Sequence, residues 1–109
     1  MRIGILGSTC DPPHKDHILA AHFAKLQFKL DRIIIVPSHI PTHKSAPMAS
    51  PTMRLAMAKL AIGQRRYWSV SSLEIRRGGI TYVRDTISAL KKKYPRADLF
   101  WILGSDSLA

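Results

Sequence analysis

Short apolar runs alternate along the chain with longer stretches in which apolar residues recur every three or four positions. The runs Ile3–Leu6, Ile33–Val36 and Phe100–Leu103 are continuous and of strand length, which is typical of parallel strands covered on both faces. A weaker run, Trp68–Val70, fills a further strand position, and Leu73–Ile75 is a second candidate for it. The pattern therefore predicts about four strands.

Three helices are expected between these strands. The second begins with Ser50 as its N-cap and Pro51 in its first turn, and the third runs from about Tyr82 to Tyr94 before Pro95. Each helix has a predicted apolar face, made of Leu19, Phe23, Leu26 and Leu30 in the first, Met53, Met57, Leu60 and Ala61 in the second, and Val83, Ile87, Leu90 and Tyr94 in the third.

This order of elements, β-α-β-α-β-α-β, predicts an α/β fold: a Rossmann-like, doubly wound parallel sheet of about four strands with right-handed crossovers. Ligands bind such sheets beyond the carboxyl ends of the strands, where the strand order reverses. We expect residues 1–109 to form a single domain, truncated after the fourth strand and incomplete at its C-terminus. An unpaired sheet edge there would invite pairing with a second copy, so a homodimer through that edge is an open prediction.

Composition narrows the class of protein. The chain has 109 residues, of which 46% are hydrophobic and 22% charged, as in soluble globular domains. No apolar run approaches the roughly 18 residues of a membrane span, so we expect no membrane partner. The short N-terminal apolar stretch does not fit a signal peptide, and the single cysteine, Cys10, agrees with a reducing compartment. We therefore expect a cytoplasmic protein.

Charge indicates an anionic ligand. Seventeen Lys and Arg against seven Asp and Glu give a formal net charge of +10, which attracts polyanions in general. Neither an RNA-binding signature nor zinc-finger spacing accompanies the basic residues, so nucleic-acid binding rests on charge alone and we do not expect it.

The loop after the first strand, Gly7–His17, has the chemistry of a phosphate site. Glycine lets the backbone approach a ligand closely, and the N-terminus of the following helix attracts anions. His14 and His17 are three residues apart, so both would lie on one side of that helix near its start. The residues alone leave open the alternative that both histidines are ordinary polar surface groups.

Four segments in order resemble one family. Gly7–His17 resembles a Gly-Gly-Thr-Phe-Asp-Pro-x-His-x-Gly-His loop, and Val36–Lys44 resembles Pro-Ser-x-x-Pro-Pro-His-Lys. Leu73–Thr86 is similar to Glu-x-x-Arg-Gly-Gly-x-Ser-Tyr-Thr-x-Asp-Thr, and Ile102–Leu108 to Gly-Ala-Asp-Ser-Leu. These are motifs of the nucleotidyltransferase superfamily, and specifically of the bacterial nicotinate mononucleotide adenylyltransferases, whose N-terminal half the chain resembles.

The resemblance implies an ATP-dependent enzyme of NAD biosynthesis. Nicotinate mononucleotide would attack the α-phosphorus of ATP and release pyrophosphate, with Mg²⁺ bound to the ATP phosphates rather than to a metal site of the protein. It assigns catalysis to His14, His17 and Lys44, ATP binding to Gly7, Ser8, Thr9 and Asp106, and nicotinate mononucleotide binding to Gly79, Thr81, Tyr82 and Val83. Backbone N–H groups of the last segment would bind the nicotinate carboxylate.

Departures from the family pattern support an alternative. Asp16 replaces a glycine, and its charge about 6 Å from a phosphate would cost roughly 3 kcal/mol at an effective dielectric near 20. The family's second half, with its remaining ATP-binding motif, is absent. The alternative is a catalytically impaired nucleotide-binding or interaction fragment of the same fold.

Other histidines and tryptophans receive structural roles. We expect His22 to be partly buried by packing, and His39 and His43 to be solvated, because the histidines lack the spacing of a zinc site. Trp68 and Trp101 are expected in the core or at strand edges.

Overall fold

A computed structural model of the chain describes residues 1–8, 10, 15–41 and 49–102. Its elements are β1 (Arg2–Ser8), α1 (Lys15–Gln27), β2 (Arg32–Pro37), β3 (Ile40–Pro41), α2 (Pro51–Ile62), β4 (Trp68–Val70), α3 (Leu73–Arg77), β5 (Ile80–Thr81), α4 (Val83–Lys93) and β6 (Asp98–Ile102). None of the helices in these described ranges is long and apolar enough to cross a membrane.

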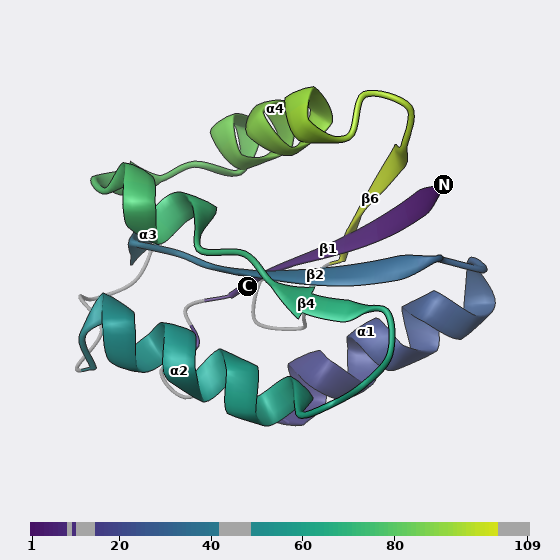
Figure 1. Ribbon diagram of the computed structural model, residues 1–109, viewed down its shortest axis with the longest axis horizontal. Helices are drawn as coiled ribbons and strands as arrows, with labels where there is room; N and C mark the ends of the chain where they lie inside the picture. Colours follow the sequence, from purple (N-terminus) through teal and green to yellow (C-terminus); the bar gives the residue numbers. More distant parts are fainter. Residues whose placement is uncertain (9, 11–14, 42–48, 103–109) are drawn as a thin grey trace.

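The predicted parallel sheet is confirmed. Its four strands run in the order β4-β2-β1-β6, all parallel, with Ile5 of β1 opposite Ile34 of β2 and Trp101 of β6. Figure 1 shows α1 and α2 on one face of the sheet and α3 and α4 on the other, which is the expected doubly wound arrangement. The strand order reverses between β1 and β6, so the loop after β1 begins at the switch point where such sheets bind ligands.

Burial of both faces explains why the strands read as continuous apolar runs. Along β1, Ile3 and Ile5 belong to a core cluster with Leu90 of α4, whereas Leu6 belongs to a cluster with Ala21 of α1 and Ala58 of α2. Successive side chains point to opposite faces of a strand, so every apolar position of the run finds a hydrophobic layer.

The predicted apolar faces of the first two helices are mostly wrong. Leu30, just after α1, is buried as predicted, and Met57 and Ala61 are partly buried, but the other predicted positions are exposed. Leu19, Phe23 and Leu26 are about half exposed or more, and in α1 the small residue Ala21 packs against the sheet instead. In α2 the buried residues are Arg54, Ala58 and Ile62, while Met53 and Leu60 are exposed. A small side chain lets the helix axis approach the sheet closely, and this decides the orientation against a stripe of larger residues.

Helix boundaries follow the local signals better than helix faces do. The Ser50 side chain accepts a hydrogen bond from the backbone N–H of Met53 at 3.2 Å, so the predicted N-cap is confirmed. The third predicted helix, α4, is confirmed within one residue of each end, with Leu90 buried and Val83 exposed.

Two short segments differ from the sequence prediction. Leu73–Ile75, a strand candidate, lies in the helix α3, and the two-residue strands β3 and β5 form an additional parallel sheet that the pattern did not indicate. The second sheet joins the segment after β2 to the segment before α4. It therefore decides where the loop that precedes α4 lies.

Candidate active site

The carboxyl ends of the parallel strands lie at one edge of the sheet, and the segments that follow β1 and β2 are connected there. The backbone N–H of Ser38, just after β2, donates to the carbonyl of Ser8 at 2.9 Å. The Ser8 hydroxyl accepts a hydrogen bond from the backbone N–H of Cys10 at 3.2 Å. Residues of the predicted phosphate loop and of the segment after β2 thus share one hydrogen-bonded edge.

Part of the predicted ATP site lies in the described chain. Gly7 and Ser8 are the last two residues of β1, and His17 lies in the first described turn of α1, where it is half-buried. The other predicted residues, Thr9, His14, Lys44 and Asp106, lie outside the described residues. The position of His17 therefore agrees with a site at the N-terminal end of α1, and the pairing of His17 with His14 stays a prediction.

Gly7 is glycine for a packing reason that the sequence did not reveal. A Cβ atom on Gly7 would lie 2.7 Å from two ring atoms of Trp101, on the neighbouring strand β6. Trp101 is partly buried against the core, as expected, and its ring covers the backbone of Gly7.

Two departures from the family pattern have different structural consequences. Asp16 is exposed, so solvent and salt screen its carboxylate from a ligand at this edge. Cys10, which stands where the recognised loop motif has Phe, is buried in the core with a left-handed backbone, at φ 59°. Burial raises the pKa of the Cys10 thiol, while a hydrogen bond with Ser8 and the charge of Arg54 partly lower it. The thiol is therefore a core group rather than a nucleophile.

The predicted nicotinate segment spans the connection from α3 to α4. Gly79 precedes β5, Thr81 is the second residue of β5, Tyr82 is the N-cap of α4 and Val83 its first residue. Tyr82 and Val83 are about half exposed. Gly78 and Gly79 have φ values of 75° and 70°, which side chains disfavour, so two consecutive glycines are required by this backbone path.

A buried carboxylate links the two helices on either side of this loop. Glu74, in α3, is fully buried, and both of its oxygens accept hydrogen bonds from Arg77. The Thr86 hydroxyl, in the first turns of α4, donates to Glu74 Oε1 at 2.6 Å. The carboxylate thereby ties the helix before the loop to the helix after it. This gives the Glu, Arg and Thr positions of the recognised motif a structural role.

Arg54 and His39 hold the segment after β2. The guanidinium of Arg54 is 1% exposed and donates to the carbonyls of Ser38, His39 (2.8 Å) and Ala49 (3.3 Å). His39 is half-buried, and its ring, although exposed to solvent as expected, is also hydrogen-bonded to the loop before β5, which the sequence did not predict. His43 lies outside the described residues. His22, expected to be partly buried, is exposed on α1.

Sequence reasoning assigned no role to Arg54, Glu74 or Thr86. A signal existed for Arg54, because it lies four and eight residues before Ala58 and Ile62 and so interrupts an apolar stripe of α2 with a cation. The Ser38 hydroxyl is a further missed group: it is buried and has no hydrogen-bond partner in the described part of the chain. Within the described ranges, no group of three or more His, Cys, Asp or Glu residues could hold a metal ion.

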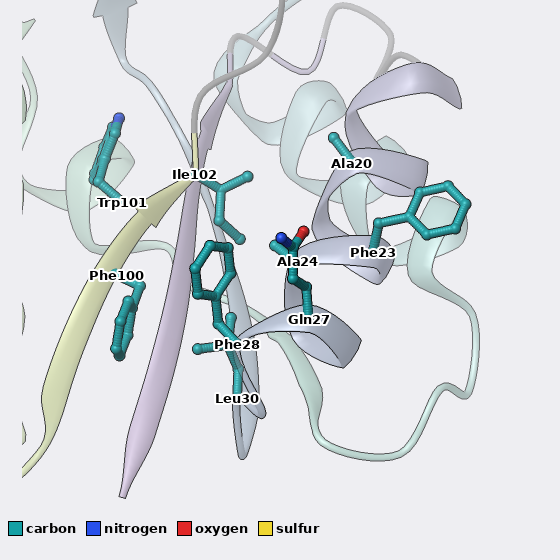
Figure 2. Close-up of a pocket in the computed structure, with 9 residues that line it drawn as sticks. All are labelled: Ala20, Phe23, Ala24, Gln27, Phe28, Leu30, Phe100, Trp101 and Ile102. Atoms are coloured by element: carbon teal, nitrogen blue, oxygen red, sulfur yellow. The ribbon is translucent and has the colours of Figure 1, made fainter.

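The hollow drawn in Figure 2 is separate from these residues. It has a volume of about 360 Å³ and lies between α1 and β6, where Phe23, Phe28, Phe100 and Ile102 are among its lining residues. Among the residues that the structure describes, none of those predicted to bind substrate lines it. It is an apolar surface beside the edge strand β6 rather than the site that the sequence motifs predict.

Comparisons with known proteins agree with these motifs. The cytidylyltransferase-like family model matches residues 5–109. A probable nicotinate-nucleotide adenylyltransferase of Exiguobacterium sibiricum is 40% identical over 108 residues, which are 99% of this chain and 57% of the relative. One from a Synechococcus species is 44% identical and matches 98% of this chain and 54% of the relative. The chain spans about half the length of the curated relatives it matches.

Solved structures show the same fold. Plasmodium falciparum nicotinic acid mononucleotide adenylyltransferase complexed with NaAD matches with a TM-score of 0.78 and 21% identity, over 96% of this chain and 52% of the other. The same enzyme complexed with APC gives a TM-score of 0.73 and 19% identity, over 96% and 51% of the two chains. The described sheet and its flanking helices therefore have the same fold as about half of that longer enzyme.

Proposed function

The chain belongs to the cytidylyltransferase-like family, and from this membership we propose that the protein is a nicotinate-nucleotide adenylyltransferase. It transfers AMP from ATP to nicotinate mononucleotide and releases pyrophosphate. Relatives with 38–44% identity carry this name, and they match almost the whole chain. The observation that carries the proposal is that the segment after β2 is hydrogen-bonded to both predicted substrate segments at one edge of the sheet. Ser38 binds Ser8 at the end of β1, and His39 binds Thr81 in β5.

The proposed reaction is an in-line displacement. A phosphate oxygen of nicotinate mononucleotide forms a bond to the α-phosphorus of ATP, and the bond from that phosphorus to the bridging oxygen of pyrophosphate breaks. ATP enters as its magnesium complex, which neutralises part of the phosphate charge. The protein contributes positioning and electrostatic stabilisation, because phosphoryl transfer of this type needs no covalent intermediate.

Each predicted residue has a role in that displacement. His14 and His17 donate hydrogen bonds to the ATP phosphates near the start of α1, where the helix dipole also favours negative charge. Lys44 reaches the triphosphate as a point charge, and Thr9 and Asp106 complete the ATP site with Gly7 and Ser8. Gly79, Thr81, Tyr82 and Val83 present backbone N–H groups to the nicotinate carboxylate.

Product analysis tests the proposal. The chain is incubated with MgATP and nicotinate mononucleotide, and the dinucleotide and pyrophosphate are quantified; CTP replaces ATP in a parallel reaction to test the base. His17→Ala removes one donor to the phosphates and is expected to lower kcat by about 10²–10³-fold. His22→Ala, an exposed histidine of the same helix, is the control and is expected to leave the rate unchanged.

A second candidate is nucleotide binding without catalysis. It is favoured by Asp16, which places a carboxylate next to His17 where the recognised motif has glycine. In that case ATP raises the melting temperature of the chain but no pyrophosphate appears. Formation of the dinucleotide refutes this candidate, and the absence of both product and ATP-dependent stabilisation refutes both candidates.

A further inference from the structure

The connection between α3 and α4 has a backbone that needs an external restraint. Gly78 and Gly79 both have positive φ, and a Cβ atom on either would meet no heavy atom within 4 Å. Consecutive glycines in open space have many accessible backbone conformations, so the peptide between Gly79 and Ile80 is not fixed by packing of its own side chains. Hydrogen bonds from elsewhere in the chain must select its orientation.

One residue, His39, supplies two such hydrogen bonds. Its ring atom Nδ1 lies 2.9 Å from the carbonyl oxygen of Gly79, and its backbone N–H donates to the Thr81 hydroxyl at 2.8 Å. A carbonyl oxygen only accepts hydrogen bonds, so Nδ1 must bear the proton. The two bonds hold the loop on both sides of Ile80, and the pairing of β3 with β5 continues the contact.

His39 can act as an anchor because its own backbone is fixed. Arg54, buried beneath it, donates to the carbonyls of Ser38 and His39, and the Ser38 N–H donates to Ser8 at the end of β1. The imidazole therefore extends from a segment attached to the central strand of the sheet. Forty residues separate His39 from Gly79, so this restraint is entirely tertiary.

We propose that His39 is a positioning residue that fixes the Gly79–Ile80 peptide for recognition of the anionic pyridine nucleotide. A peptide group is planar, with its C=O and N–H directed to opposite sides. When Gly79 C=O is held toward His39, the N–H of Ile80 is held in the opposite direction. Loss of the ring removes the side-chain hydrogen bond that reinforces the β3–β5 pairing at this carbonyl, so the peptide becomes more mobile and the donor orientation of the loop is less sharply defined. The inference rests on the proposed function, because it assigns His39 to the nicotinate side of that site.

The test compares His39→Ala with His39→Asn, whose side-chain NH₂ can replace the Nδ1–H donor. Order parameters of the Gly79 and Ile80 amides are measured by ¹⁵N relaxation in the ligand-free chain, and KM is measured for both substrates. His39→Ala is expected to lower these order parameters from near 0.85 toward 0.6 and to raise KM for nicotinate mononucleotide about tenfold, the equivalent of one hydrogen bond. The KM for ATP and kcat should stay within about twofold, and His39→Asn should restore most of the loss.

Two further variants separate the possible outcomes. Thr81→Val removes the acceptor of the second hydrogen bond and is expected to loosen the same amides, whereas the exposed His22→Ala should change neither readout. Unchanged order parameters in His39→Ala, or an equal rise of both KM values, overturn the inference. If the unmodified chain does not bind nicotinate mononucleotide, the proposed function fails, and the order parameters still decide whether His39 holds the loop.

Discussion

Replacing Arg54 tests how much the buried guanidinium contributes to stability. In Arg54→Met the carbonyls of Ser38, His39 and Ala49 lose a charged donor. Hydrogen bonds to charged groups contribute about 1.5–3 kcal/mol each, but their sum is an upper limit because water can reach part of the vacated space. We expect a loss of about 3–5 kcal/mol, comparable to breaking a buried ion pair. This is a large share of the roughly 5–15 kcal/mol that stabilises a typical domain.

Urea unfolding followed by tryptophan fluorescence measures this loss, because Trp68 and Trp101 are both partly buried against the core. Arg54→Lys keeps the charge but not the planar fork of donors, so it should fall between Arg54→Met and the unmodified chain. Arg84→Met is the matched control: the Arg84 side chain is 88% exposed, and a change within about 0.5 kcal/mol is expected. A loss below about 1 kcal/mol in Arg54→Met, with an unchanged m-value, would refute the reasoning.

Three further predictions concern packing and the thiol. Gly7→Ala places a methyl group against Trp101 and should cost about 1–3 kcal/mol by thermal or urea unfolding, and Trp101→Leu in the same chain should recover part of that loss. Iodoacetamide should leave Cys10 unmodified in the folded chain at neutral pH, because the raised pKa of the buried thiol keeps it protonated to a higher pH than usual. Labelling should increase in alkali and on unfolding. Rapid labelling of the native chain would contradict the buried position of the thiol. Leu60→Lys, at an 81% exposed position, should change the free energy of unfolding by less than about 0.5 kcal/mol, whereas Ala58→Leu should cost about 1–3 kcal/mol; the reverse ranking would restore the helix face predicted from sequence.

The apolar stripe of a helix is a weaker guide than its ends. The ends of α2 and α4 follow from a capping serine and from a proline after the helix, which act within a few residues. The buried face depends on what the helix packs against, and in α2 it includes Arg54, whose partners are carbonyls of the segment after β2 and of Ala49. No pattern of hydrophobicity within the helix contains those partners.

The sequence by itself determined the parallel α/β order and the position of the loop after β1, because both depend on local apolar runs, turn residues and motif order. Through the resemblance of four motifs, it also predicted which segments bind substrate. The tertiary structure decided how those segments are held: Glu74 joins α3 to α4, and His39 joins the end of β2 to the loop before β5. The His39 amide and the Thr81 hydroxyl are 42 residues apart in sequence. Hydrogen bonds of that range form only when the sheet has brought the carboxyl ends of its strands to one edge, and no local signal in the sequence specifies them.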